Sequence, residues 1–178
     1  MDEHDLAVRA SQGDLEAFAE LVHLHQGAVY NTAWRMLGNR QEAEDAAQEA
    51  FLRAFRSIRT LDPSRPPGPW LRRIAVHTAL NRLERHPALP IEDASLVPSP
   101  DPPPEPQVLR REQDRQVRFA LLSLPPRYRA VIELRHFEEL SYAEMAEALD
   151  RPLSDVKSDL FRARRMLAER LKEIRWNT

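Results

Sequence analysis

The sequence LPPRYRAVIELRHFEELSYAEMAEALDRPLSDVKSDLFRARRMLAERL, residues 124–171, decides the fold of the second half of the chain. Within it, Ser141 is a favourable helix N-cap, and Glu144 follows at the spacing of a capping box. Behind this cap, apolar side chains recur with helical period at Met145, Ala146 and Leu149. Pro152 cannot continue a helix and disfavours helical backbone at the residue before it. The pattern predicts a short capped helix over residues 142–149.

A second helix is predicted directly after this turn, with Ser154 as its N-cap. Its apolar positions are spaced for one buried stripe: Val156, Leu160, Ala163 and Leu167. That spacing leaves polar, basic and aromatic side chains off the stripe: Lys157, Ser158, Phe161, Arg162, Arg164 and Arg165. Two helices with a tight turn and a basic outer face are typical of a helix-turn-helix, whose second helix enters a DNA major groove. The alternative is a helical hairpin with a solvated charged face.

Three ordered motifs in this region carry a family resemblance. They are L-P-P-R-Y-R-x-V, then L-R-H-F-E-x-L-S-Y-x-E-M-A, then V-K-S-x-L-F-R-A-R. Together they resemble the fourth conserved domain of bacterial sigma factors of the extracytoplasmic-function group. The resemblance implies that the second helix reads the minus-thirty-five promoter element with these residues: Ser154, Asp155, Lys157, Ser158, Phe161, Arg162, Arg164 and Arg165. Arg164 and Arg165 are expected at phosphates, which position the helix without specifying sequence.

The recognition helix departs from the family pattern at three acidic or small positions. Ser154 and Asp155 stand where Gly and Thr are usual, and Asp159 replaces a usual Arg. A carboxylate near phosphates weakens binding, but it can also accept a hydrogen bond from the amino group of cytosine. We therefore hypothesise that Asp155 or Asp159 gives an unusual minus-thirty-five preference.

Composition bounds the remaining possibilities. The chain has 178 residues, 42% of them hydrophobic and 30% charged, which suits one medium domain or two small ones. It has no cysteine, so disulfides, thiolate metal sites and cysteine nucleophiles are excluded. The N-terminus is acidic and no apolar run is long enough to cross a bilayer, so we expect a cytoplasmic protein without membrane insertion. The net charge of −2 does not decide whether the chain binds nucleic acid, because basic residues can share one face.

The N-terminal half is predicted to be helical. Residues 5–37 show two amphipathic helices, with Gly27 expected to break the run and Gly38-Asn39 to end it. A long helix is predicted from Arg40 to Leu61, with a buried stripe of small and aromatic side chains: Ala43, Ala46, Ala47, Ala50, Phe51, Ala54, Phe55 and Ile58. No run resembles a strand, so the fold class is all-α.

A second face of the helix at 40–61 carries acidic side chains and one apolar residue. Its members fall at i, i+3, i+4 and i+7: Asp45, Gln48, Glu49 and Leu52. From spacing alone an ordinary solvated face is favoured. The run E-D-A-A-Q-E-A-F-L-R-A-F, however, resembles the polymerase-binding helix of the second sigma domain. The resemblance implies that these four residues contact core RNA polymerase, where complementary charge would help to fix the register.

The loop at 62–69 is proline-rich and is predicted to be neither helix nor central strand. A helix is expected from about Trp70 to Arg85, and four polar side chains share one face of it: Arg73, His77, Asn81 and Arg85. The motif W-L-x-R-I-A-x-x-T-A-x-N resembles the promoter-melting segment of the same sigma domain. The resemblance implies that this face holds the single-stranded minus-ten element, and that the loop before it frames a pocket for a flipped base.

Two departures in this segment bear on minus-ten preference. His77 stands where the family often has Asn, and Pro66, Pro67 and Gly68 replace the usual Phe or Tyr of the loop. Trp70 offers a surface on which a base can stack, but a tryptophan in the first turn of an amphipathic helix more often packs inward, and we expect packing.

The two helical domains are joined by a linker. Residues 87–107 are acidic, rich in proline and free of Lys and Arg, which predicts an extended, flexible tether. We therefore predict a sigma-2-like four-helix domain at residues 1–86 and a sigma-4-like helix-turn-helix domain at 108–178, which begins with a helix from about Val108 to Leu122. The tether either follows a basic channel of the polymerase or is a mere spacer.

An enzyme is not expected, because no phosphate loop, triad context or metal-ligand spacing occurs in the sequence. No cofactor or metal is implied. The predicted function is that of a transcription initiation factor that directs core RNA polymerase to promoter DNA. The alternatives are a stand-alone helix-turn-helix regulator and, less favoured, a pure interaction protein. We expect a monomer when free, and the resemblance implies an anti-sigma factor as a further partner.

Overall fold

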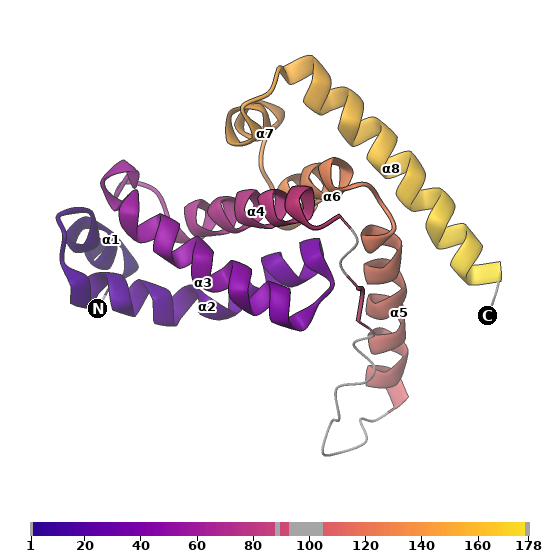
Figure 1. Ribbon diagram of the computed structural model, residues 1–178, viewed down its shortest axis with the longest axis horizontal. Helices are drawn as coiled ribbons and strands as arrows, with labels where there is room; N and C mark the ends of the chain where they lie inside the picture. The colour runs from indigo at the N-terminus through magenta and orange to yellow at the C-terminus, as the bar shows by residue number, and fades with distance from the viewer. Residues whose placement is uncertain (1, 88–89, 93–104, 177–178) are drawn as a thin grey trace.

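The structure is a computed structural model that describes residues 2–87, 90–92 and 105–176. All the regular elements in these ranges are helices, which confirms the all-α prediction (Figure 1). Four helices build the N-terminal half: α1 (Glu3–Ser11), α2 (Leu15–Leu37), α3 (Arg40–Arg56) and α4 (Pro67–Arg85). The C-terminal half contains α5 (Glu105–Leu122), α6 (Pro126–Ile132), the π-helical turn η3 (Glu133–Phe137), α7 (Tyr142–Leu149) and α8 (Leu153–Trp176).

Helix α2 corrects the expected break at Gly27. The Asp14 carboxylate caps the helix by accepting from the backbone N–H groups of Glu16 and Ala17, and the helix then continues unbroken to Leu37. A glycine inside a helix costs only about 1 kcal/mol relative to alanine, which the packing of a long helix offsets. The true end is Gly38, whose φ of 65° gives the left-handed cap that glycine favours.

The next two helices also differ from their predicted bounds. The predicted helix at 40–61 is two elements, α3 and a separate 3-10 turn, η1 (Ile58–Thr60). The break falls at Ser57, whose hydroxyl donates to the Arg53 carbonyl at 2.9 Å and caps the end of α3. Helix α4 starts at Pro67, three residues before the predicted start. Prolines are tolerated in a first turn, whose N–H groups lack an intrahelical acceptor in any case.

The helix-turn-helix is confirmed as α7 and α8. The Ser141 hydroxyl accepts from the Glu144 N–H at 3.2 Å and the Glu144 carboxylate accepts from the Ser141 N–H at 2.8 Å, which is the predicted capping box. Helix α7 ends at Leu149, and Asp150 caps it in the left-handed conformation, with a φ of 50°. Helix α8 begins at Leu153, so Ser154 lies in its first turn and is not the N-cap.

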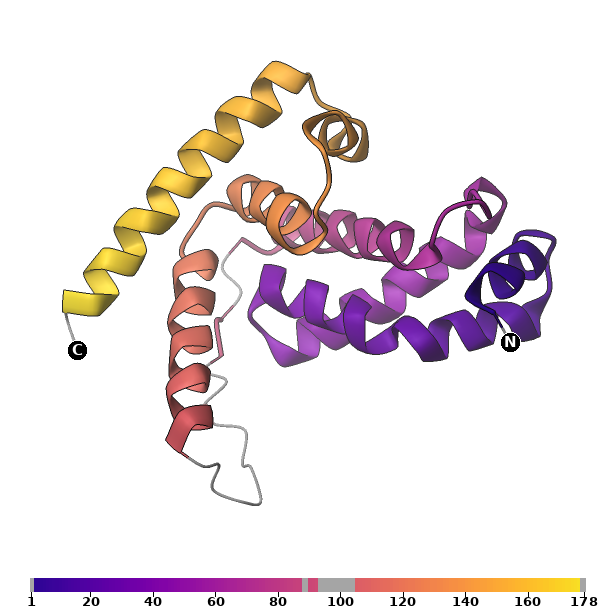
Figure 2. The ribbon, with the colours of Figure 1, turned by 180° about the vertical axis from the view of Figure 1, so that it is seen from behind.

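The two halves share one hydrophobic core. From α2, α3 and α4 this core takes Ala33, Met36, Leu37, Ala43, Ala46, Val76, Ala79 and Leu83. The C-terminal half contributes buried side chains that include Leu121, Leu124, Val131, Leu134 and Met145. Figures 1 and 2 show α6 lying along α4, with α7 and α8 beyond it. The molecule is therefore closed, with the helix-turn-helix half packed on the N-terminal half.

Polar contacts hold the same interface at the C-terminal end of α2. Arg35 donates to both carboxylate oxygens of Glu133, with the shortest distance 2.6 Å, and its guanidinium lies 4.2 Å from the centroid of the Phe137 ring. Arg129 donates to the carbonyl oxygens of Met36, Leu122 and Leu124 at 2.7–2.8 Å. Burial raises the pKa of Glu133 and lowers that of Arg129. These contacts form the latch of the closed form.

Most of the predicted linker at 87–107 lies outside the described residues. Residues 90–92 run past the corner between α2 and α3, where Asn39 Nδ2 donates to the Pro90 carbonyl at 3.2 Å and the Glu92 N–H donates to the Gly38 carbonyl at 2.8 Å. Helix α5 begins at Glu105, so the last three residues assigned to the tether are helical. Residues 90–92 of the tether are thus fixed to the N-terminal half.

Candidate functional site

The outer face of α8 is an open, basic surface. Val156, Leu160 and Ala163 are buried beneath it, and Leu167 is partly buried. All eight residues predicted to read the minus-thirty-five element are exposed: Ser154, Asp155, Lys157, Ser158, Phe161, Arg162, Arg164 and Arg165. Phe161 is 70% exposed, more than any other large hydrophobic side chain whose exposure the structure describes. A protruding aromatic ring among guanidinium groups suits contact with base edges and phosphates together.

The structure corrects the hypothesis that Asp159 reads the minus-thirty-five element, because Asp159 does not belong to this surface. It is 3% exposed, and its carboxylate lies 2.7 Å from Arg151 Nη1 and 4.0 Å from Arg127 Nε. Asp159 therefore ties the turn and α6 to α8 and cannot read a base from this position. Helical spacing could have shown this, since residue 159 is at i+3 from Val156 and falls on the buried stripe. Asp155 is exposed and remains a candidate for the unusual preference.

The outer face of α3 carries the four residues expected at polymerase. Leu52 is 58% exposed and Gln48 is exposed, whereas Asp45 and Glu49 are partly buried. The Asp45 carboxylate accepts from Gln41 Nε2 at 3.0 Å on the same helix. An apolar side chain flanked by carboxylates is the surface that the spacing predicted. Phe55 was expected in the buried stripe, but it is 44% exposed, and its ring lies 5.3 Å from that of Phe18.

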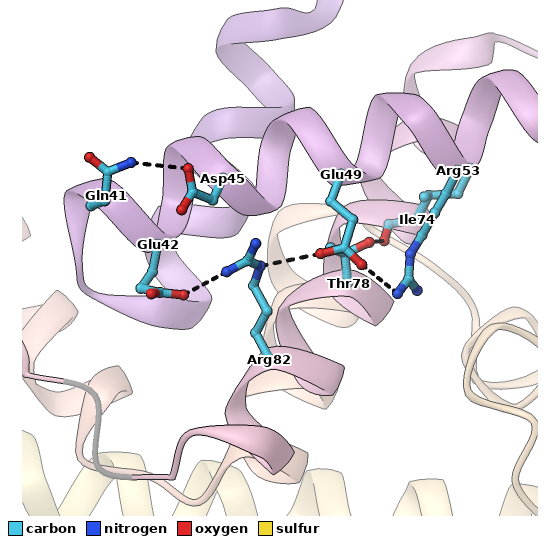
Figure 3. A network of polar contacts seen from close by, with 8 residues as sticks. All are labelled: Gln41, Glu42, Asp45, Glu49, Arg53, Ile74, Thr78 and Arg82. Atoms are coloured by element: carbon cyan, nitrogen blue, oxygen red, sulfur yellow. Dashed lines mark hydrogen bonds and ion pairs between the residues drawn. The ribbon is translucent and has the colours of Figure 1, made fainter.

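Arg82 of α4 joins this face to the next helix, and the sequence analysis did not single it out. Its Nη1 lies 2.7 Å from Glu42 Oε2 and its Nε lies 3.4 Å from Glu49 Oε2 (Figure 3). Arg53 holds the other oxygen of Glu49 at 2.6 Å. Glu49 thus sits between two guanidinium groups, and its orientation depends on α4 as well as on α3.

The polar face of α4 is covered over part of its length. Arg85 is exposed, but Arg73, His77 and Asn81 are partly buried. His77 Nε2 makes a short hydrogen bond to the Ala148 carbonyl, and Arg73 Nη2 lies 3.9 Å from Glu144 Oε1. The structure therefore does not leave these four residues together on one open surface. Trp70 packs against the cores of the N-terminal half, as expected.

A cavity of about 570 Å³ opens beside the first turn of α4. On one side it is lined by the loop before α4 together with Arg73 and Trp70. On the other side it is lined by the C-terminal half, including Glu138, Glu139, Glu144 and Glu147. The loop thus frames a pocket, but carboxylates of the other half form its opposite wall.

Within residues 2–87, 90–92 and 105–176, no three His, Cys, Asp or Glu side chains lie close enough together to hold a metal ion. Over the same ranges, no helix is long and apolar enough to span a membrane.

An open basic helix-turn-helix, joined to a helical domain with an acidic and apolar face, defines a DNA-binding transcription protein. Comparisons with known proteins give the family. Sigma-70 region 2 matches residues 21–87, and Sigma-70 region 4 matches residues 114–167. The chain is 34% identical over 177 residues to ECF RNA polymerase sigma factor SigW of Bacillus subtilis, covering 93% of this chain and 95% of the relative.

Solved structures agree with this assignment. CnrH in complex with the cytosolic domain of CnrY is similar at a TM-score of 0.67 and 26% identity, covering 96% of this chain and 97% of that one. The sigma factor RpoE of Bartonella quintana, solved with the anti-sigma factor NepR, shares the fold at a TM-score of 0.61 and 20% identity, covering 89% and 98%.

The chain belongs to the extracytoplasmic-function sigma factors. It directs RNA polymerase to promoters and is not an enzyme. The stand-alone regulator is set aside, because the match to Sigma-70 region 2 lies in the half that a regulator would not need.

Proposed function

We propose that the two halves divide the promoter between them, as the sequence predicted. The exposed face of α8 reads the double-stranded minus-thirty-five element, and Arg73, His77, Asn81 and Arg85 hold the single-stranded minus-ten element. The observation that carries the proposal is the α8 surface, on which all eight predicted residues face solvent while the apolar stripe is buried. Such a helix can enter a groove without rearranging.

Core RNA polymerase binds the outer face of α3 in this proposal. Leu52 supplies an exposed apolar contact, and Asp45, Gln48 and Glu49 supply acceptors for a basic partner helix. Charge complementarity of this kind fixes register and speeds encounter. We infer domain limits near 1–86 and 108–178, a monomer when free, and the cytoplasm as the compartment, where promoter DNA and polymerase are.

An anti-sigma factor is the further partner that we propose. Two structural relatives were solved with a bound partner, CnrY or the anti-sigma factor NepR. The closed arrangement gives such a partner a surface that spans both halves. Pull-down of a partner by the full chain, but not by the chain bound to core polymerase, is the outcome this proposal expects.

Run-off transcription with purified core polymerase and a random promoter library tests the proposed division of labour. The triple variant D45A/Q48A/E49A is expected to lose promoter-dependent transcripts. Its matched control is E16A/E20A/Q26A, which likewise removes two carboxylates and one side-chain amide, from exposed positions of α2. Transcription that survives the first variant as well as the second excludes α3 as the polymerase contact.

A further inference from the structure

A buried carboxylate at one edge of the reading face of α8 holds two arginines from other elements. Asp159 Oδ2 lies 2.7 Å from Nη1 of Arg151, in the turn before α8, and 4.0 Å from Nε of Arg127, in the first turn of α6. The side chain of Asp159 is 5% exposed, whereas those of Arg151 and Arg127 are 31% and 57% exposed. Because two guanidinium groups share one carboxylate, the group as a whole carries a positive charge.

Tyr128 connects these arginines to the reading face itself. Arg127 Nη2 donates to the Tyr128 hydroxyl at 2.8 Å, and the Arg127 guanidinium lies 4.7 Å from the centroid of the same ring. Hydrogen bonds, first from Arg127 and then from Arg162 of α8, lower the pKa of Tyr128. An arginine that is both hydrogen-bonded and stacked on a ring has little conformational freedom left to lose when it binds an anion. Arg127 is therefore already ordered at the edge of α8.

The opposite edge of α8 carries a second group of cations. The Arg135 guanidinium and Lys157 Nζ lie 5.0 Å and 5.7 Å from the centroid of the Tyr142 ring of α7. Lys157 and Asp159 are two positions apart, so they do not share a face of the helix. An α-helix with its side chains nearly fills a major groove about 12 Å wide, so a helix seated there has a phosphate backbone on either side. Cations on the α6 side and on the α7 side of α8 thus lie where the two DNA strands would pass.

We propose that Arg127 and Arg151 contact DNA phosphates on the α6 side of the minus-thirty-five element, and that Asp159 is the positioning residue that holds them there. The proposal rests on the proposed role of α8 as the reading helix. Guanidinium groups suit this task, because they bind phosphate oxygens with two parallel, charge-assisted hydrogen bonds. Neither arginine belongs to α8, so α6 and the turn supply the positive charge of this edge. Such contacts fix the position of α8 in the groove without reading a base.

Binding of the full chain to a fluorescent duplex over a range of salt concentrations tests the proposal. The duplex carries a minus-thirty-five element recovered from the promoter library, and a scrambled duplex is measured beside it. R127A removes one exposed guanidinium and leaves Arg151 to neutralise Asp159. Affinity is expected to fall about fivefold on both duplexes, and the slope of log affinity against log salt to decrease by about 0.9, as for one lost phosphate contact. The matched control R56A removes an exposed arginine from the end of α3 and should leave the slope unchanged.

Two further variants separate phosphate contacts from net charge. R127A/R151A/D159N removes two positive charges and one negative charge, so its net charge equals that of R127A, and it leaves no buried carboxylate without its partners. Its slope should decrease by about 1.8, because both proposed contacts are lost. D159N makes the chain more positive, which by net charge alone would tighten binding. We expect binding about threefold weaker instead, because the arginines lose the group that orders them. Circular dichroism checks that each variant is folded.

The outcomes distinguish this inference from the proposed role of α8. If K157A/R162A weakens binding while R127A and the triple variant match R56A, α8 reads the duplex but the two arginines do not contact it, and the inference alone is overturned. Equal slopes for R127A and the triple variant overturn the contact of Arg151, and tighter binding of D159N overturns the positioning role of Asp159. If K157A/R162A has no effect either, the proposed role of α8 fails and the inference fails with it.

Discussion

Helices α8 and α4 carry the two proposed DNA surfaces, and they differ in how much of that surface is free. In α8 the eight predicted residues are all exposed, whereas in α4 only Arg85 is exposed among four. Both sets follow helical spacing equally well. The difference arises because α8 packs through one stripe, whereas α4 contacts α2 and α3 on one side and α6 on another. Spacing identifies which residues share a face, but the neighbours decide whether that face is open.

A variant that breaks the latch between the two halves should have the largest effect, because the latch helps to hold the C-terminal half over α4. E133A leaves the partly buried Arg35 guanidinium without its carboxylate, which is expected to cost about 3 kcal/mol of unfolding free energy. Urea unfolding followed by circular dichroism measures this cost. E139Q changes an exposed carboxylate of the same turn and serves as the control. Similar urea midpoints for E133A and E139Q would show that the pair of Arg35 and Glu133 does not stabilise the fold.

The open surface of α8 should respond directly to loss of its charges. K157A/R162A is expected to weaken binding to minus-thirty-five duplex DNA by about 2 kcal/mol, roughly thirtyfold, with no loss of stability since both side chains are exposed. Fluorescence anisotropy at fixed salt measures the affinity. K172A/R170A changes the same residue types further along α8 and should have a smaller effect. Equal losses for the two pairs would mean that binding depends on net charge alone.

Gly38 tests how closely the two halves approach. A Cβ built there would lie 2.7 Å from Leu122 Cδ1, and the φ of 65° already disfavours other residues. G38A is expected to cost about 1.5 kcal/mol, the sum of backbone strain and a displaced Leu122. The double variant G38A/L122A, compared with L122A alone, separates the two causes in thermal unfolding. A cost that is unchanged by L122A assigns the whole effect to the backbone.

The smallest effect concerns His136 beside α8. Burial first, then the charges of Arg164 and Arg135, lower the pKa of His136 below 6.5 in the folded protein. The neutral form is therefore favoured on folding, so its contribution to stability is complete above pH 6.5 and declines as pH falls toward the lowered pKa. Melting temperatures of the natural protein and H136Q should converge with falling pH. H23Q, which changes an exposed histidine of α2, is the control. Melting temperatures of the natural protein and H136Q that change in parallel with pH would contradict this prediction.

The sequence by itself determined the helices, the capping box at Ser141 and Glu144, and the exposed face of α8. These features depend on neighbours within one or two turns, and local spacing records them directly. The motifs also sufficed to indicate the family. Small shifts in helix limits, such as the early start of α4 at Pro67, reflect how the first turn tolerates prolines.

Only the tertiary structure decided which polar side chains form ion pairs or hydrogen bonds with other elements. Asp159 lies on the buried stripe and is held by Arg151 and Arg127, while Arg82 fixes Glu49 from another helix. Closure of the C-terminal half over α4 brings together residues about 70 positions apart, such as His77 and Ala148. Contacts at that separation depend on how the two halves pack, and no periodicity in one helix records the charge of a residue on another. Local sequence set each face, and long-range packing determined which faces are covered.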